Sequence, residues 1–147
     1  MKVRLEIDDS LKEDEIVIRT KEYTEELKQL ISNFKSKPSI QFFKQDTEYY
    51  LDLDAILFFE SDNGTVYAHT VSDMFSTTQK LYELENLLGG QFMRVSKSTI
   101  LNLDQIYALT KSISNCQIQF HHSYKTVYVS RRYYRELKDK LNERRTY

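Results

Sequence analysis

The chain has 147 residues and a formal net charge of −1, from 21 basic and 22 acidic side chains. This length suits one domain with a small appendage, which can bury a core without disulfide bonds. The lone Cys116 excludes an intramolecular disulfide, and no apolar run approaches the roughly 20 residues of a membrane-spanning helix. The N-terminal residues 1–6 lack the apolar segment of a secretory signal. We therefore expect a cytoplasmic protein without membrane insertion.

The charges are distributed unevenly along the chain. Residues 1–44 carry nine basic and nine acidic side chains, residues 45–90 carry one and nine, and residues 91–147 carry eleven and four. The middle of the chain is therefore acidic and its last part basic. A basic region of this size favours an anionic partner for the C-terminal part.

Residues 1–37 are expected to form a β-β-α extension. Alternating apolar residues predict short strands at residues 3–7 and 16–18. A helical apolar stripe follows, with Thr20 as its expected N-cap and Pro38 as its stop. The stripe consists of Tyr23, Leu27, Leu30, Ile31 and Phe34. Its apolar face must cover either the rest of the chain or a second copy, and the sequence leaves both possibilities open.

Residues 38–147 show the pattern of a mainly β domain with short helices. Short apolar runs separated by turn signals predict an antiparallel sheet. The expected strands are residues 40–44, 48–52, 55–60, 65–71, 91–95, 105–110, 116–120 and 125–129. The strongest hairpin signal is Asn63-Gly64, because this pair supplies the two positive φ angles of a type I′ turn. Side chains expected in the core are Phe42, Phe58, Phe59, Phe92, Cys116 and Phe120.

Two helices are expected to interrupt the strands. The first has its apolar positions at Leu81, Leu84, Leu87 and Leu88. Thr77 or Thr78 is its expected N-cap, and Gly89-Gly90 ends it. The second begins after Ser130 and buries Tyr134, Leu137 and Leu141. Its basic side chains at Arg131, Arg135 and Lys138 share an adjacent face.

No arrangement of residues indicates catalysis or a metal site. His69 has no ligand residue at a suitable spacing, and the side chains of His121 and His122 would diverge on a strand. The carboxylates of Asp52 and Asp54 alternate with leucines, as on a solvated strand face. The sequence contains no Gly-rich phosphate loop and no nucleophile motif. We expect no enzyme, no cofactor and no small-molecule substrate.

Two runs in the basic part combine apolar anchors with basic and hydroxyl side chains. The first, residues 91–102, carries Arg94, Ser96, Lys97 and Ser98. The second, residues 129–137, carries Ser130, Arg131, Arg132 and Arg135. Lysine and arginine donate hydrogen bonds to phosphate oxygens and to guanine O6 and N7. The two runs are therefore interpreted as one surface that faces phosphates and bases.

These runs and two others resemble the LytTR family of bacterial DNA-binding domains. The matching segments read LDLDAILFFES (51–61), LYELE (81–85), RVSKSTILNLDQI (94–106) and VYVSRRY (127–133). The resemblance covers about residues 40–143 in the order of the family. It implies an elongated, mostly antiparallel β fold of the α+β class. In that fold, loops rather than a recognition helix enter successive major grooves of double-stranded DNA.

The resemblance also implies base reading from three loop positions. These positions fall on Asn63 and Thr65, on Lys97, and on Arg132. Ser130 and Arg131 lie beside the third position and are expected to contact phosphates, and Arg135 is expected to contact phosphates or solvent. The DNA-binding set is Asn63, Thr65, Arg94, Ser96, Lys97, Ser98, Ser130, Arg131, Arg132 and Arg135.

The leading hypothesis is a sequence-specific transcriptional regulator that binds double-stranded DNA as a homodimer. Many family members carry an N-terminal phosphoacceptor domain, for which 37 residues are too few, so a stand-alone relative of the response regulators is expected. Its regulation would depend on concentration, on dimerisation through residues 1–37 or on a partner protein. The alternative hypothesis is a protein-interaction module that docks an acidic partner on the basic C-terminal face.

Overall fold

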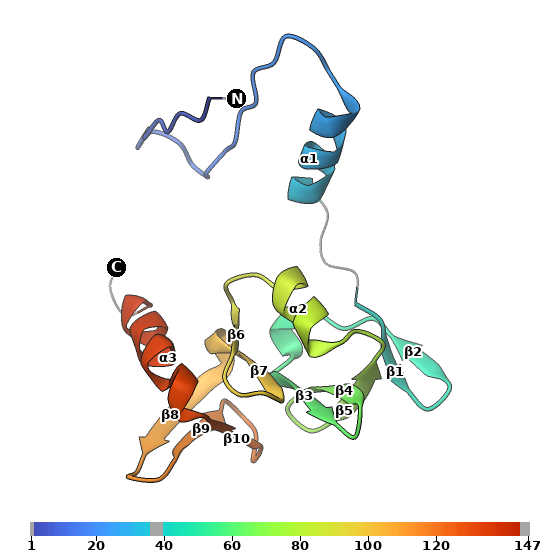
Figure 1. Cartoon of the computed structure of the whole chain (residues 1–147), viewed down its shortest axis with the longest axis vertical. Helices are drawn as coiled ribbons and strands as arrows, with labels where there is room; N and C mark the ends of the chain where they lie inside the picture. Colours follow the sequence, from blue (N-terminus) through green and yellow to red (C-terminus); the bar gives the residue numbers. More distant parts are fainter. Residues whose placement is uncertain (1, 36–39, 145–147) are drawn as a thin grey trace. The chain divides into compact units, whose positions relative to one another are not determined.

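The computed structural model describes residues 2–35 and 40–144, and the chain divides into two compact units, residues 1–37 and 38–147 (Figure 1). Helix α1, Glu25–Lys35, is present in the first unit. Its cap is Thr24, whose Oγ1 accepts a hydrogen bond from the Leu27 N–H at 3.3 Å, so the prediction of Thr20 was wrong. The expected stop at Pro38 lies outside the described residues.

The prediction of two strands before α1 was also wrong. Residues 2–24 contain no strand, and Val3, Leu5 and Ile7 are 94%, 84% and 89% exposed. An isolated strand needs a hydrogen-bonding neighbour and an apolar surface to cover, and within this unit the alternating residues have neither.

The second unit contains a seven-stranded antiparallel sheet, which confirms the predicted mainly β class. Its strands, in spatial order, are β2 (Thr47–Tyr49), β1 (Phe42–Lys44), β5 (Met74–Thr77), β4 (Thr65–His69), β3 (Phe58–Asp62), β7 (Thr99–Asn102) and β6 (Phe92–Arg94). Asp62 pairs with Thr65 across the β3–β4 turn. Asn63 and Gly64 there have φ angles of 50° and 82°, which confirms the predicted hairpin turn.

A second sheet and two helices complete this unit. The sheet has the order β10 (Thr126–Val129), β9 (Cys116–Phe120) and β8 (Ile106–Lys111). The helices are α2 (Leu81–Leu87) and α3 (Arg131–Glu143), and short 3₁₀ turns lie at η1 (Leu53–Ala55) and η2 (Leu103–Gln105). None of the helices in residues 2–35 and 40–144 is long and apolar enough to cross a membrane.

Two strands, β5 and β7, were absent from the prediction. All four residues of β7 are buried, so the strand has no polar alternation that would mark it in the sequence. The expected strand at 55–60 is shifted to β3, because Asp52 starts the 3₁₀ turn instead by accepting a hydrogen bond from the Asp54 N–H at 3.1 Å. The carboxylates of Asp52 and Asp54 therefore lie on an exposed turn, not on a strand face.

Helix α2 begins later than predicted. Its N-cap is Lys80, whose N–H donates to the Glu83 carboxylate at 3.2 Å. The hydroxyl of Thr77 accepts a hydrogen bond from Gln79 before the helix, so the prediction of Thr77 or Thr78 as the cap was wrong. Of the four leucines that mark this helix in the sequence, Leu81, Leu84 and Leu88 are buried and Leu87 is 42% exposed.

The core forms two clusters on opposite faces of β3. Phe58 belongs to one cluster and Phe59 to the other. The phenylalanines predicted for the core and Cys116 are all buried. Leu137 of α3 is fully buried, with Tyr134 and Leu141 packed beside it as predicted. Buried Asn102 donates from Nδ2 to the Ile56 carbonyl at 2.9 Å and accepts from the Asp104 N–H at 3.0 Å. It thereby fixes the two 3₁₀ turns to the sheet.

Candidate nucleic-acid interface

Backbone hydrogen bonds join three segments that the sequence places far apart. They are the tip of the β3–β4 hairpin (61–65), the β6–β7 loop (95–98) and the β10–α3 junction (130–132). The Ser61 N–H donates to the Ser98 carbonyl at 2.8 Å, and the Ser130 N–H donates to the Val95 carbonyl at 2.9 Å. The β6–β7 loop therefore lies between the other two segments and is hydrogen-bonded to the strand or junction of each.

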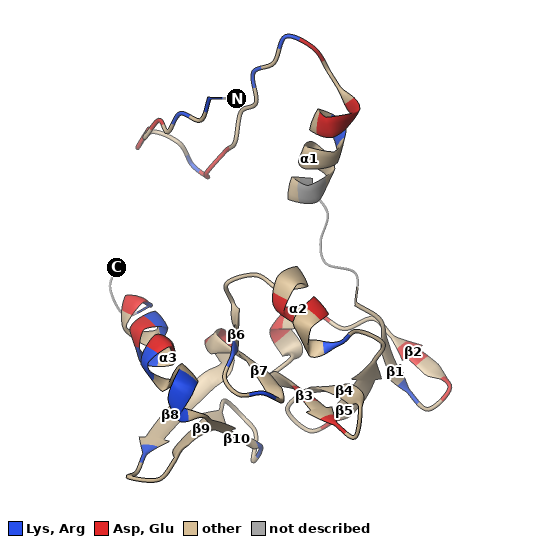
Figure 2. Cartoon of the chain, in the orientation of Figure 1, with Lys and Arg blue, Asp and Glu red and all other residues tan. Residues whose placement is uncertain are grey.

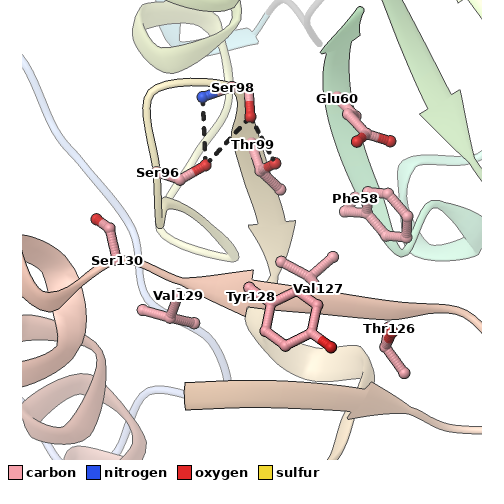
Figure 3. A pocket seen from close by; sticks show the side chains of 10 residues that line it. All are labelled: Phe58, Glu60, Ser96, Ser98, Thr99, Thr126, Val127, Tyr128, Val129 and Ser130. Atoms are coloured by element: carbon pink, nitrogen blue, oxygen red, sulfur yellow. Dashed lines mark hydrogen bonds between the residues drawn. The ribbon is translucent and has the colours of Figure 1, made fainter. Parts of the chain in front are cut away.

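A pocket of about 360 Å³ lies between β3, the β6–β7 loop and β10 (Figure 3). Most of its polar lining consists of hydroxyl groups, from Ser96, Ser98, Thr99, Thr126, Tyr128 and Ser130. Hydroxyl groups donate to phosphate oxygens without adding charge. Glu60 contributes a carboxylate to the same lining.

Ser96 and Ser98 shape the β6–β7 loop. The Ser96 hydroxyl accepts a hydrogen bond from the Ser98 N–H at 3.2 Å, and the two hydroxyl oxygens lie 3.4 Å apart. Lys97 lies between them and is exposed. Among the described residues its ammonium group has no hydrogen-bond or ion-pair partner, so its charge is available to an external anion or base edge.

Arg94 differs from the other predicted DNA-binding cations. Its Nε donates to the Ser96 carbonyl at 2.7 Å, its Nη1 lies 3.0 Å from the Glu85 carboxylate, and its Nη2 donates to the Lys97 carbonyl. Its side chain is only 19% exposed. The structure therefore places this guanidinium against the protein's own loop.

The start of α3 presents three exposed arginines, Arg131, Arg132 and Arg135. None of them has an ion-pair partner among residues 2–35 and 40–144, whereas the later cations Lys140 and Arg144 pair with Glu136 and Asp104. Figure 2 shows this concentration of basic residues at the first turn of α3. Positive charge there opposes the helix dipole, so folding alone does not favour these arginines.

Two further features of the α3 start suit an anion. Ser130 is the N-cap, but its hydroxyl makes no capping hydrogen bond. The Arg132 guanidinium carbon lies 5.5 Å from the centre of the Tyr133 ring, which holds the side chain against the helix. Hydroxyl, guanidinium and free backbone N–H groups together form an arrangement that accepts phosphate oxygens.

The β3–β4 turn brings Asn63 to an exposed position, with Thr65 half-buried beside it in β4. Exposed Asp62 flanks both and adds a negative charge. Close approach of a phosphate is therefore less favourable here than at the other two segments.

Sequence reasoning missed Thr126 and Tyr128, which lie exposed on β10 and line the pocket. Their alternation with buried Val127 and Val129 was the signal that could have identified them.

His69, which sequence reasoning treated as a strand residue, supports the pocket. Its ring stacks on Phe58, with centroids 4.3 Å apart, and its Nε2 lies 3.4 Å from the Glu60 carboxylate. Burial, reinforced by the Lys125 charge, lowers the pKa of His69 to about 4, so the ring is neutral at pH 7.

Residues 2–35 and 40–144 contain no cluster of His, Cys, Asp and Glu that would hold a metal ion. Burial raises the pKa of the Cys116 thiol, which favours the protonated form.

The chain matches proteins of one family. The model of the LytTr DNA-binding domain matches residues 46–142. An uncharacterised HTH-type transcriptional regulator of Staphylococcus aureus (strain NCTC 8325 / PS 47) is 30% identical over 94 residues, and its counterpart in strain MRSA252 is 29% identical. Each alignment covers 64% of this chain and 64% of the relative's length.

A solved structure shares the fold. It is a LytTr DNA-binding domain from a Bacillus cereus protein assigned as a methyl-accepting/DNA response regulator, with a TM-score of 0.66 and 20% identity. The alignment covers 72% of this chain and 98% of that domain. In the described residues, strands separate each helix from the next, as expected for this mainly β fold. The match over residues 46–142 includes every strand of both sheets except β1, and nearly all of α3. By this match, the chain belongs to the LytTr DNA-binding domain family.

Proposed function

We propose that this protein is a transcriptional regulator that binds double-stranded DNA sequence-specifically and reads the major groove through loops. The observation that carries the proposal is the junction of the β6–β7 loop with the start of α3. There, Lys97 and Arg132 have no carboxylate partner among the described residues, next to a hydroxyl-lined pocket. Such a role belongs in the cytoplasm and needs no cofactor.

The residues divide into two roles by their positions in the loops. Lys97 and Arg132 occupy the reading positions that the family resemblance implies, and their side chains can donate to guanine O6 and N7. Arg131, Arg135 and the serine hydroxyls hold phosphates and set the register on the duplex. Asn63 and Thr65 form the third contact, in which Asn63 carries the base-reading amide.

Selection of bound duplexes from a random pool tests this function. A sequence reader enriches one motif and prefers the selected duplex over random duplex at every salt concentration, while its affinity for both falls steeply with salt. The alternative, an interaction module that docks an acidic partner on the basic face, would bind all duplexes alike. A pool with no enriched motif after repeated selection would contradict the proposal.

We also propose that the protein binds DNA as a homodimer through α1. Within the first unit, Leu30 and Phe34 of α1 are 36% and 62% exposed, although they belong to its apolar stripe. A second copy offers the same stripe in return, as a two-fold interface requires. If the protein is monomeric in solution, a regulatory protein partner is the expected occupant of this face.

A further inference from the structure

Arg94 is a cation of the basic run 91–102, which is proposed to face DNA. Two of its guanidinium N–H groups nevertheless donate to backbone carbonyls of the β6–β7 loop. Nε donates to Ser96 at 2.7 Å, and Nη2 donates to the carbonyl of Lys97 itself. Nη1 completes the set on Glu85 of α2, at 3.0 Å. A planar guanidinium can satisfy three acceptors in this way, because its donors form a rigid fork.

We infer that Arg94 is a positioning residue that sets the conformation of the β6–β7 loop so that Lys97 faces the base edges. The inference rests on the proposed function. Glu85 neutralises the charge of Arg94, and 81% of the side chain is withdrawn from solvent, since 19% is exposed. A phosphate anchor needs the opposite arrangement, in which the donors are free and the charge is uncompensated.

The middle of the β6–β7 loop depends on this side chain, because the other backbone hydrogen bonds of the loop lie at its two ends. The Val95 N–H donates to the Thr99 carbonyl at 3.0 Å and closes the loop, and the Ser98 carbonyl is taken by Ser61. The carbonyls of Ser96 and Lys97 lie between these bonds, and Arg94 holds both. With its backbone held on both sides, Lys97 retains freedom only in its side chain.

Glu85 extends the support to α2, a helix that carries none of the predicted DNA-binding residues. Its carboxylate fixes the side of the guanidinium that faces away from the loop. Leu81 and Leu84 anchor α2 in the core, at 7% and 0% exposure. The buried leucines therefore hold α2, Glu85 of α2 binds Arg94, and Arg94 binds the backbone carbonyl of Lys97.

Binding measurements on Arg94→Gln, Arg94→Lys and Glu85→Gln test this inference. With the selected duplex, we expect both Arg94 variants to lose about tenfold or more in affinity, while random-duplex affinity and the salt slope stay nearly unchanged. Glu85→Gln should show the same pattern with a smaller loss. Arg131→Gln is the matched control for a phosphate contact, and it should weaken both duplexes and reduce the salt slope by about one unit.

Arg94→Lys separates the two roles, because it keeps the charge and loses the fork. A phosphate anchor would retain most of its binding in this variant, and that result would overturn the inference. In a Lys97→Ala background, Arg94→Gln should cause little further loss of discrimination, since both changes remove the same contact. Additive losses would also overturn it.

Amide hydrogen exchange gives a readout without DNA. The amides of Val95 and Ser98 should exchange faster in Arg94→Gln than in the unaltered protein, with the thermal transition of the whole protein retained. Unchanged exchange in both amides would contradict the positioning role. Faster exchange without any sequence preference in the unaltered protein would instead count against the proposed function alone.

Discussion

Nζ of Lys125 lies 3.3 Å from Nδ1 of His69, and this pair joins the two sheets of the second unit. His69 ends β4 of the seven-stranded sheet, and Lys125 precedes β10 of the three-stranded sheet. Lys125 also donates to the Asp73 carbonyl, and the Ser123 hydroxyl donates to the Val71 carbonyl at 2.7 Å. These contacts connect the β9–β10 loop of one sheet to the end of β4 and the β4–β5 loop of the other.

The neutral state of His69 predicts a pH dependence of stability. Its pKa is about 4 in the folded protein, against 6.5 for a free histidine, so the unfolded chain takes up the proton first as the pH falls. The free energy of unfolding is fully retained above pH 6.5 and decreases towards pH 4. The shift from 6.5 to about 4 corresponds to an expected loss of at most about 2 kcal/mol between pH 7 and pH 5.

Urea denaturation at the two pH values measures this loss. His69→Gln has no imidazole to protonate and should lose clearly less stability over the same interval. Equal losses in the variant and the unaltered protein would assign the pH dependence to other groups.

Substitutions at the proposed reading positions should remove discrimination. We expect Lys97→Ala and Arg132→Ala each to cost about 1–3 kcal/mol on the selected duplex and little on random duplex. Arg135→Ala should weaken both duplexes together and flatten the salt slope by about one unit. If folded Lys97→Ala and Arg132→Ala lose specific and random binding equally, these residues are phosphate anchors.

Leu137 anchors α3, and with it the arginines of its first turn. Because its side chain is fully buried, we expect Leu137→Ala to lower the free energy of unfolding by about 2–5 kcal/mol. Leu87→Ala is the matched control and should cost less, since Leu87 is 42% exposed and Leu137 is fully buried. Chemical denaturation of both variants measures the difference, and similar effects would show that α3 is not held by this contact.

The exposed face of α1 should support self-association. Replacing Leu30 and Phe34 together by Asp introduces two charges on the stripe, and we expect the mass in solution to fall to that of one chain. Gln29→Asp, outside the stripe, is the control and should leave the mass unchanged. Light scattering of the full chain measures this, and a monomeric unaltered protein would favour a different protein as the occupant of this face.

A dimer also predicts the arrangement of its DNA. Two copies that read one face of the duplex must stay in phase with the helix, so the half-sites should lie roughly 10 base pairs apart or a multiple of it. Inserting five base pairs between the half-sites should therefore abolish dimer binding, and an insertion of ten should restore it. Equal affinity for both spacings would contradict simultaneous reading.

Local chemistry allowed the sequence alone to determine several parts of this protein. Asn63-Gly64 specifies a turn wherever it occurs between strands, because its φ angles depend on these two residues. The spacing of Tyr134, Leu137 and Leu141 likewise specifies the buried face of α3 before any partner is known. The motifs around Lys97 and Arg132 indicated the family that residues 46–142 match.

Other features were decided only by the tertiary structure. The apolar alternation at residues 3–7 matches a strand, but without a neighbouring strand it forms none. Strand β7 shows no alternation, since the sheet and the core bury both of its faces. Arg94 looks like any other cation of the basic run until Glu85, nine residues earlier, takes its charge. A side chain's charge is read from the sequence, but its partner is set by which elements pack together.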